Sequence, residues 1–205
     1  MSTSRTLPAL VVSAILTVLA GCSAAPDTAF PTTPTTAATA AASASPSTSS
    51  SGAPAVEQPA APTKVSIPSV GITSSLMKLG LNADGTVEVP PADQGMTAGW
   101  YTGASVPGAA GAAVIIGHND TRYGKAVFHD LKDIKKGADI TVTNTRGETA
   151  HFTVTSTESV SKKSFPTEKV YGPTTGHALR LITCDGSFDA QGHPVNNLIV
   201  YATLN

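Results

Sequence analysis

Cys184, in the second half of the chain, is a candidate nucleophile. It follows the apolar run 181–183 and precedes Asp185-Gly186, so we expect it where a strand opens into a loop. The strand would fix its backbone, and the loop would leave its side chain accessible. The chain has only 2 cysteines, so Cys184 is either a reactive thiol or a buried, inert side chain. The local sequence leaves both alternatives open.

A thiol nucleophile needs a neighbouring base or cation that favours its thiolate form. His118 closes the apolar run 113–117 and is therefore also expected at a strand-to-loop junction. The other histidines fall in other predicted elements: His129, His151, His177 and His193. His118 is the best-placed acid–base partner for Cys184, although its position also fits a purely structural role.

Metal chemistry has little support in the sequence. No group of cysteines and histidines has the spacing of a zinc site, and Cys184 with His193 would supply too few ligands. The Asp84-Gly85 pair weakly matches a calcium loop, but 82–85 is better explained as a hairpin-type turn. We therefore expect neither a metal ion nor an organic cofactor.

Short apolar runs separated by turn residues predict the elements that position these side chains. Four segments alternate apolar and polar residues as half-buried strands do: 65–67, 86–89, 140–142 and 151–154. Three runs that are apolar apart from Arg180 are typical of strands buried on both faces: 112–116, 179–182 and 198–202. Only 128–135 has helical spacing. Many short strands with turns between them predict an all-β barrel or sandwich.

Residues 1–22 have the order of an export signal. Arg5 precedes the apolar run 7–20, which is shorter than the about 20 residues that span a bilayer. The run ends in Leu-Ala-Gly-Cys, which resembles a bacterial lipobox whose Cys22 carries the lipid and begins the mature protein. The alternative is an uncleaved anchor helix in which Cys22 is incidental. Both interpretations place 23–205 outside the cytoplasm, tethered to the outer face of the membrane.

Residues 23–63 consist almost entirely of Ala, Ser, Thr and Pro, with Asp27 and Glu57 as the only charges. Such a segment cannot bury enough apolar surface to offset the entropy of ordering, so we predict a disordered, fairly extended linker. Residues 64–205 remain as one domain, long enough for a hydrophobic core. The net charge of the chain is −1, so its charge does not point to nucleic acid as a partner.

The most specific motif combination in this domain is Gly-His-Asn-Asp at 117–120 with Leu-Arg-Leu-Ile-Thr-Cys at 179–184. Further motifs lie in order along the chain, at 67–72, 81–91, 100–101, 126–128, 165–167, 170–172 and 197–202. Together they resemble the sortase family, most closely the class F type of actinobacteria. The similarity covers essentially all of 64–205.

The resemblance implies an eight-stranded β-barrel with short helical turns and an active site at one end of a groove. It implies that Cys184 attacks a Leu-Pro-x-Thr-Gly-like sorting signal, usually between Thr and Gly, and forms a thioacyl-enzyme. His118 would protonate the departing amine and later deprotonate an incoming amine of a cell-wall precursor or another protein. The expected protein is a monomer without a cofactor.

The resemblance also assigns a substrate groove. The segment 160–173 corresponds to the loop that grips the Leu-Pro end of the signal. Five residues are expected to line the groove: Phe165, Pro166, Val170, Tyr171 and Thr183. Each of them would also fit a role in packing alone.

One departure from the family concerns the arginine that sortases carry on the last strand, where it hydrogen-bonds the substrate and the developing oxyanion. That position falls at or near Val195, and 191–197 contains no arginine. Loss of one oxyanion donor costs about 10²–10³ in turnover. The amides of Asn196 and Asn197 and the guanidinium of Arg122 are candidates to replace it.

Three hypotheses follow. The first is an anchored, extracytoplasmic cysteine transpeptidase that transfers the acyl group to an amine or to water. The second, motivated by the missing arginine, is a non-catalytic or weakly active relative that binds sorting-signal or cell-wall peptides. The third is a structural lipoprotein in which Cys184 is inert. The sequence does not disclose the preferred signal, the acceptor amine or the client protein.

Overall fold

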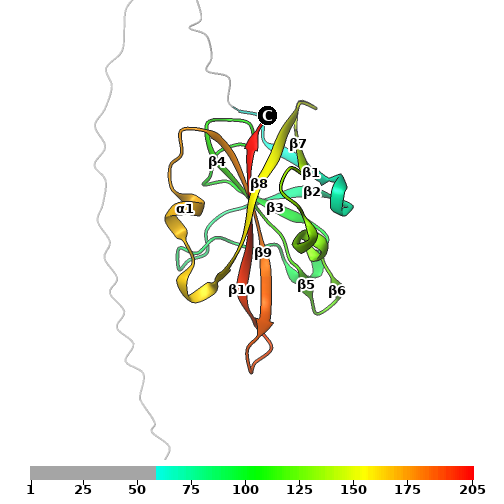
Figure 1. The fold of residues 1–205 in the computed structure, drawn as a ribbon, viewed down its shortest axis with the longest axis vertical. Coiled ribbons are helices and arrows are strands. Elements are labelled where there is room, and N and C mark those ends of the chain that lie inside the picture. Colours follow the sequence, from blue (N-terminus) through cyan, green and yellow to red (C-terminus); the bar gives the residue numbers. More distant parts are fainter. Residues whose placement is uncertain (1–58) are drawn as a thin grey trace, which may run out of the picture. The chain divides into compact units, whose positions relative to one another are not determined.

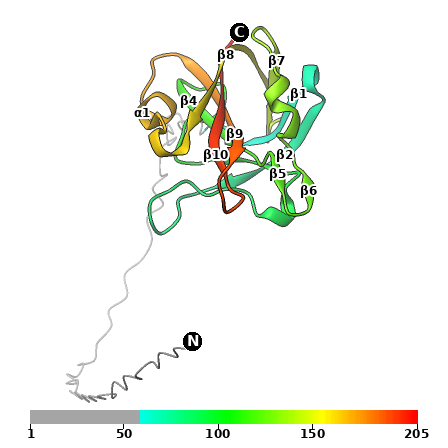
Figure 2. The same ribbon diagram turned by 60° about the horizontal axis from the view of Figure 1, so that its bottom comes forward.

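The structure is a computed structural model that describes residues 59–205, and these residues form a β-barrel (Figures 1 and 2). Eight strands close it in the order β1-β2-β3-β4-β9-β10-β8-β7, and β5 and β6 form a separate two-stranded ribbon. The strands are β1 (Pro62–Ile67), β2 (Ile72–Leu79), β3 (Ala98–Tyr101), β4 (Gly111–Ile116), β5 (Asp120–Thr121), β6 (Gly124–Lys125), β7 (Asp139–Asn144), β8 (Thr149–Ser161), β9 (His177–Phe188) and β10 (Pro194–Leu204). The predicted eight-stranded all-β barrel is confirmed.

The helical elements of the described residues are short. They are the 3₁₀ helices η1 (Pro68–Val70), η2 (Ala92–Gln94), η3 (His129–Asp133) and η4 (Lys162–Ser164), and the helix α1 (Thr167–Tyr171). Only η3 occupies the helix predicted at 128–135, and it is shorter than predicted. It ends because Ile134 takes an extended backbone, with φ −62° and ψ 142°, and is buried in the core.

Six of the seven predicted strand segments lie within observed strands. The prediction for 86–89 is wrong, since this stretch makes only an isolated bridge between Leu81 and Val87. Side chains take the amide protons that a ladder would use: Gly80 N donates to Glu88 Oε2 at 2.6 Å and Thr86 N donates to Asp84 Oδ1 at 2.9 Å. The predicted turn at 82–85 is present, with Gly85 N donating to Asn82 O.

Strand β1 begins at Pro62, just inside the segment predicted as linker. The predicted export signal, Cys22 and most of the linker lie outside the described residues. Within 59–205, no helix combines the length and apolar character that crossing a bilayer requires.

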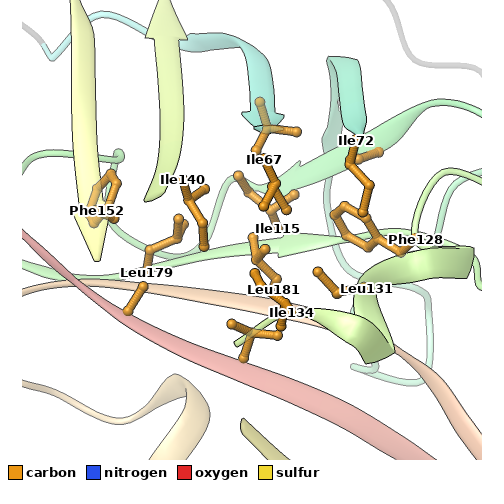
Figure 3. Close-up of a cluster of buried hydrophobic side chains, with 14 of the residues drawn as sticks. Ile67, Ile72, Ile115, Phe128, Leu131, Ile134, Ile140, Phe152, Leu179 and Leu181 are labelled. Carbon is orange, nitrogen blue, oxygen red and sulfur yellow. The ribbon is translucent and has the colours of Figure 1, made fainter. Parts of the chain in front are cut away.

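Successive residues of the central strands face two different hydrophobic clusters, which explains their continuous apolar runs. The inner cluster fills the barrel and is shown in Figure 3; it includes Ile115 of β4 and Leu181 of β9. The next residue along each strand, Ile116 and Ile182, belongs to an outer cluster. The remaining buried members of the outer cluster are Leu79, Val114, Val170, Ile199 and Tyr201. Helix α1 packs against β4 and supplies Val170 to this second face (Figure 1).

Candidate active site

Cys184 and His118 lie on the same face of the barrel because β4 and β9 are parallel neighbours. Ile116 pairs with Ile182, and Gly117 N extends the ladder by donating to Ile182 O at 3.1 Å. His118 and Cys184 each follow these paired isoleucines by two residues. Since side chains alternate along a strand, Cys184 shares the outer face with Ile182. Both His118 and Cys184 line one groove there.

The groove has a volume of about 790 Å³, within the range of about 300–1,000 Å³ usual for ligand sites. Its floor includes Ile116 and Ile182 of the outer cluster. One side is formed by the connector between β2 and β3, through Leu81, Val87 and Val89 among others. No Asp or Glu is among the described residues that line it.

Aromatic side chains form a further wall of the groove. The rings of Tyr101 and Tyr171 meet edge to face with centroids 6.0 Å apart, and Phe165 lies 6.0 Å from Tyr171. Burial, and less strongly the neighbouring Tyr101, raises the pKa of Tyr171, so its hydroxyl stays neutral at physiological pH. This wall suits apolar side chains of an extended peptide.

Cys184 is the free thiol of the described chain, and it is partly exposed at the groove. Lys162 donates a hydrogen bond from Nζ to Cys184 Sγ at 3.5 Å. A cation in contact with a thiol favours the thiolate, which is the nucleophilic form. Lys162 also lines the groove.

The imidazole of His118 is held by the β2–β3 connector. Its Nε2 lies 2.6 Å from the carbonyl oxygen of Pro90. A carbonyl oxygen only accepts hydrogen bonds, so Nε2 carries a proton and donates it. Nδ1 is therefore the nitrogen at which His118 can take up or release a second proton.

The candidates to replace the family's arginine as hydrogen-bond donor differ in whether they line the groove. Asn197 pairs directly with Cys184 across β9 and β10 and lines the groove. Val195 lies at a shift of register in β10 and does not line the groove, so the position across from Cys184 is Asn197 and not Val195. Asn196 is also absent from the groove lining, and its side chain lies against Gly186.

Arg122 does not reach the site either. It lies in the turn between β5 and β6, donates to Tyr123 Oη at 2.8 Å and stacks on that ring at 4.8 Å. The prediction that Arg122 reaches into the groove is not met, because its loop holds the guanidinium on its own tyrosine.

Three of the five residues expected to line the groove do so: Phe165, Tyr171 and Thr183. Thr183 is buried, and its Oγ1 has no hydrogen-bond partner. Pro166 and Val170 are not part of the lining. Pro166 precedes the first turn of α1, and Val170 is fully buried in the outer cluster because that face of the short helix packs on the barrel.

The sequence analysis missed Lys162 and the apolar residues of the connector. The connector carries a usable signal in the sequence, because Leu81 and Val89 are large apolar residues close to turn residues. In the structure they remain 54% and 58% exposed. The sequence gives no such signal for Lys162, since two lysines after a strand, Lys162-Lys163, are typical of a solvent-exposed surface. Residues 59–205 contain no group of three or more His, Cys, Asp or Glu side chains that could hold a metal ion.

Residues 65–205 match the sortase domain family. The chain therefore belongs to the sortase family, a family of cysteine transpeptidases. No curated protein matches the chain.

Solved structures of several sortases share this fold. Sortase A from Corynebacterium diphtheriae is 25% identical with a TM-score of 0.55, and the match covers 73% of this chain and 62% of that chain. The chain thus spans less than two thirds of that relative. Sortase A of Listeria monocytogenes is 22% identical over 72% of this chain and 88% of that chain, with a TM-score of 0.54. Sortase C-1 from Actinomyces oris is 21% identical over 70% and 73%, with a TM-score of 0.55.

Proposed function

We propose that this protein is an active sortase of the class F type, which cleaves a Leu-Pro-x-Thr-Gly-like signal and transfers its acyl part to an amine. The observation that carries the proposal is the placement of the Cys184 thiol and the His118 imidazole along one peptide-sized groove. Family membership supports the same chemistry. The motifs at 117–120 and 179–184, with those at 67–72 and 197–202, support the class F assignment.

In the first half-reaction, the Cys184 sulfur attacks the carbonyl carbon of the signal's Thr–Gly bond. A carbon–sulfur bond forms, and the carbon–nitrogen bond breaks as His118 gives a proton to the departing amine. In the second half-reaction, an incoming amine gives a proton to His118 and attacks the thioester, which releases Cys184. Water in place of the amine gives hydrolysis.

The hydrogen bond of His118 favours one ring nitrogen for the proton that is exchanged with the departing and incoming amines. Because Nε2 is engaged by Pro90 O, Nδ1 is the site that loses and regains the proton. The aromatic wall of Phe165 and Tyr171 would receive the apolar Leu-Pro end of the signal. Asn197, across from Cys184, would donate to the developing oxyanion.

The test is a cleavage and transfer assay with the full chain. A Leu-Pro-x-Thr-Gly-type peptide is incubated with and without an added amine such as triglycine. The products are separated by chromatography and identified by mass spectrometry. We expect release of the glycine-terminal fragment and, with amine present, the transfer product, and loss of both in Cys184→Ala and His118→Ala. No product from the wild-type protein over a panel of such peptides would overturn the proposal.

A second candidate function, peptide binding without catalysis, is favoured by one observation: no arginine is among the described residues that line the groove. In the same assay this candidate predicts saturable binding of the peptide, measured by fluorescence anisotropy, with no product. It also predicts that Cys184→Ala binds as well as the wild type.

We further propose that the domain is anchored to the outer face of the cell membrane through residues 1–22, with Cys22 as the lipid-bearing residue. The support is the lipobox-like ending of the apolar run. Metabolic labelling with a fatty-acid analogue should mark the wild type and not Cys22→Ser. Partitioning of the wild type into the aqueous phase of a detergent extraction would defeat this anchor.

A further inference from the structure

The groove contains one full positive charge, and that charge touches the sulfur. Lys162 is the only Lys or Arg among the described residues that line it, and none of these residues is acidic. Its Nζ lies 3.5 Å from Cys184 Sγ. A negative charge that develops in this groove therefore has Lys162 as its nearest fixed counter-charge.

Three neighbouring strands bring Lys162 to this place. Val160 of β8 pairs with Asn197 of β10, and Asn197 pairs with Cys184 of β9, so these three residues form one row across the sheet. Lys162 follows Val160 by two residues and continues on its face as β8 gives way to η4. There Ser161 Oγ accepts a hydrogen bond from Lys163 N at 3.2 Å, which fixes the turn from which Lys162 extends.

We propose that Lys162 is the cation that holds Cys184 as its thiolate. The proposal rests on the proposed function, because it concerns the nucleophile of that reaction. The proton that leaves the thiol passes to the His118 imidazole. A side chain already in contact with the nucleophile needs no rearrangement before attack.

The other ionisable groups around the sulfur leave this role to Lys162. Within the groove they are His118, Tyr101 and Tyr171, and burial raises the pKa of Tyr171 so that its hydroxyl stays neutral at physiological pH. Asp185 is the next residue along β9 and so points to the opposite face. Asp189, in the turn after β9, has its pKa lowered chiefly by a hydrogen bond from His193 N, with only a minor part from Lys162.

The test measures the thiolate directly and needs no peptide substrate. The full chain is treated with iodoacetamide at pH 7, and alkylation of Cys184 is followed by mass spectrometry of its peptide, which separates it from Cys22. A unit charge 3.5 Å away favours the thiolate about tenfold even in water-like surroundings. We expect Lys162→Met to slow alkylation about threefold at pH 7, because the higher nucleophilicity of a more basic thiolate partly offsets its smaller thiolate fraction. At pH 10, where the thiol ionises unaided, the substitution should not slow alkylation.

Two variants make the result specific. Lys162→Arg keeps the charge and should alkylate at the wild-type rate. Lys163→Met removes the neighbouring exposed lysine, which does not line the groove, and should alkylate like the wild type. Thermal melts of all variants check that the barrel is intact.

The proposal is overturned if Lys162→Met alkylates at the wild-type rate, or if Lys163→Met slows as much as Lys162→Met. The outcome is independent of catalysis. Slower alkylation of Lys162→Met in a protein that cleaves no sorting peptide would uphold the ion pair and refute the transpeptidase. Peptide cleavage by the wild type with unchanged alkylation of Lys162→Met would uphold the transpeptidase and refute the ion pair.

Discussion

Substitution of Gly117 by alanine tests how the barrel holds His118 in place. A Cβ atom at residue 117 would lie 2.6 Å from Phe128 Cδ2 and 2.8 Å from Val127 Cγ1. Carbon atoms in contact prefer about 3.5–4.0 Å, so the Phe128 ring would have to withdraw by about 1 Å. Phe128 is fully buried in the inner cluster, so it has no free space to withdraw into.

This overlap sets the expected magnitude. Extra volume in a packed core costs about 1–3 kcal/mol, which for a domain of this size lowers the melting temperature by roughly 3–12 °C. Relief of the clash also moves His118, since Phe128 N donates to His118 O at 2.9 Å and Gly117 N donates to Ile182 O at 3.1 Å. A displacement of about 1 Å in a catalytic group costs about 10²-fold in rate, so peptide cleavage should fall by that order.

Circular dichroism melts and the cleavage assay measure the two effects. Gly176→Ala is the matched control, because a Cβ there meets nothing within 4 Å and the residue is exposed. Its melting temperature and cleavage rate should stay at the wild-type values. A Gly117→Ala protein that melts and cleaves like the Gly176→Ala control would refute the argument that this close contact positions the imidazole.

Three other substitutions follow from the same structure. Asn197→Ala should lower the cleavage rate about 10²-fold by removing a donor beside the thioester, whereas Asn196→Ala, outside the groove, should not; equal rates would remove Asn197 from the site. Val170→Ala should lower the free energy of unfolding in urea by about 2 kcal/mol, because the side chain is fully buried, and no loss would mean that α1 is not packed on the barrel. The pKa of Glu158 is lowered chiefly by a hydrogen bond from Lys169, so its stabilisation is present above the ordinary carboxyl range and is lost as the pH falls through the lowered value. Melts at pH values from about 6 down to about 3 should fall more steeply for the wild type than for Glu158→Gln, and parallel profiles would contradict this.

The barrel was predictable because the order of apolar and polar residues in each strand shows which of its faces are buried. Apolar runs such as 112–116 and 179–182 contain residues for both the inner and the outer cluster, and only strands buried on two faces need that composition. The placement of His118 and Cys184 followed from the same runs, since each residue comes just after one. His118 and Cys184 share one face of the barrel because β4 and β9 pair in parallel, and the sequence of either strand alone does not show this pairing.

The parts that sequence analysis missed depend on register and on side-chain hydrogen bonds. The shift of register near Val195 brings Asn197 opposite Cys184, and a count of residues along the chain does not reveal it. Lys162 reaches the sulfur only because β10 lies between β8 and β9. The segment 86–89 has a strand's alternation, yet side-chain acceptors take the amide protons of Thr86 and of its neighbour Gly80 that a ladder would use, so its pattern alone was misleading.

The most direct test of the account is the mass of the protein during turnover. The full chain is mixed with an excess of a Leu-Pro-x-Thr-Gly-type peptide, the reaction is quenched in acid, and the intact protein mass is measured by mass spectrometry. The account predicts a species heavier by the acyl fragment, attached at Cys184 through a bond that hydroxylamine cleaves, and absent in Cys184→Ala. Wild-type protein that binds the peptide and never gains this mass, or Cys184→Ala that still gains it, would contradict the assignment of Cys184 as the nucleophile.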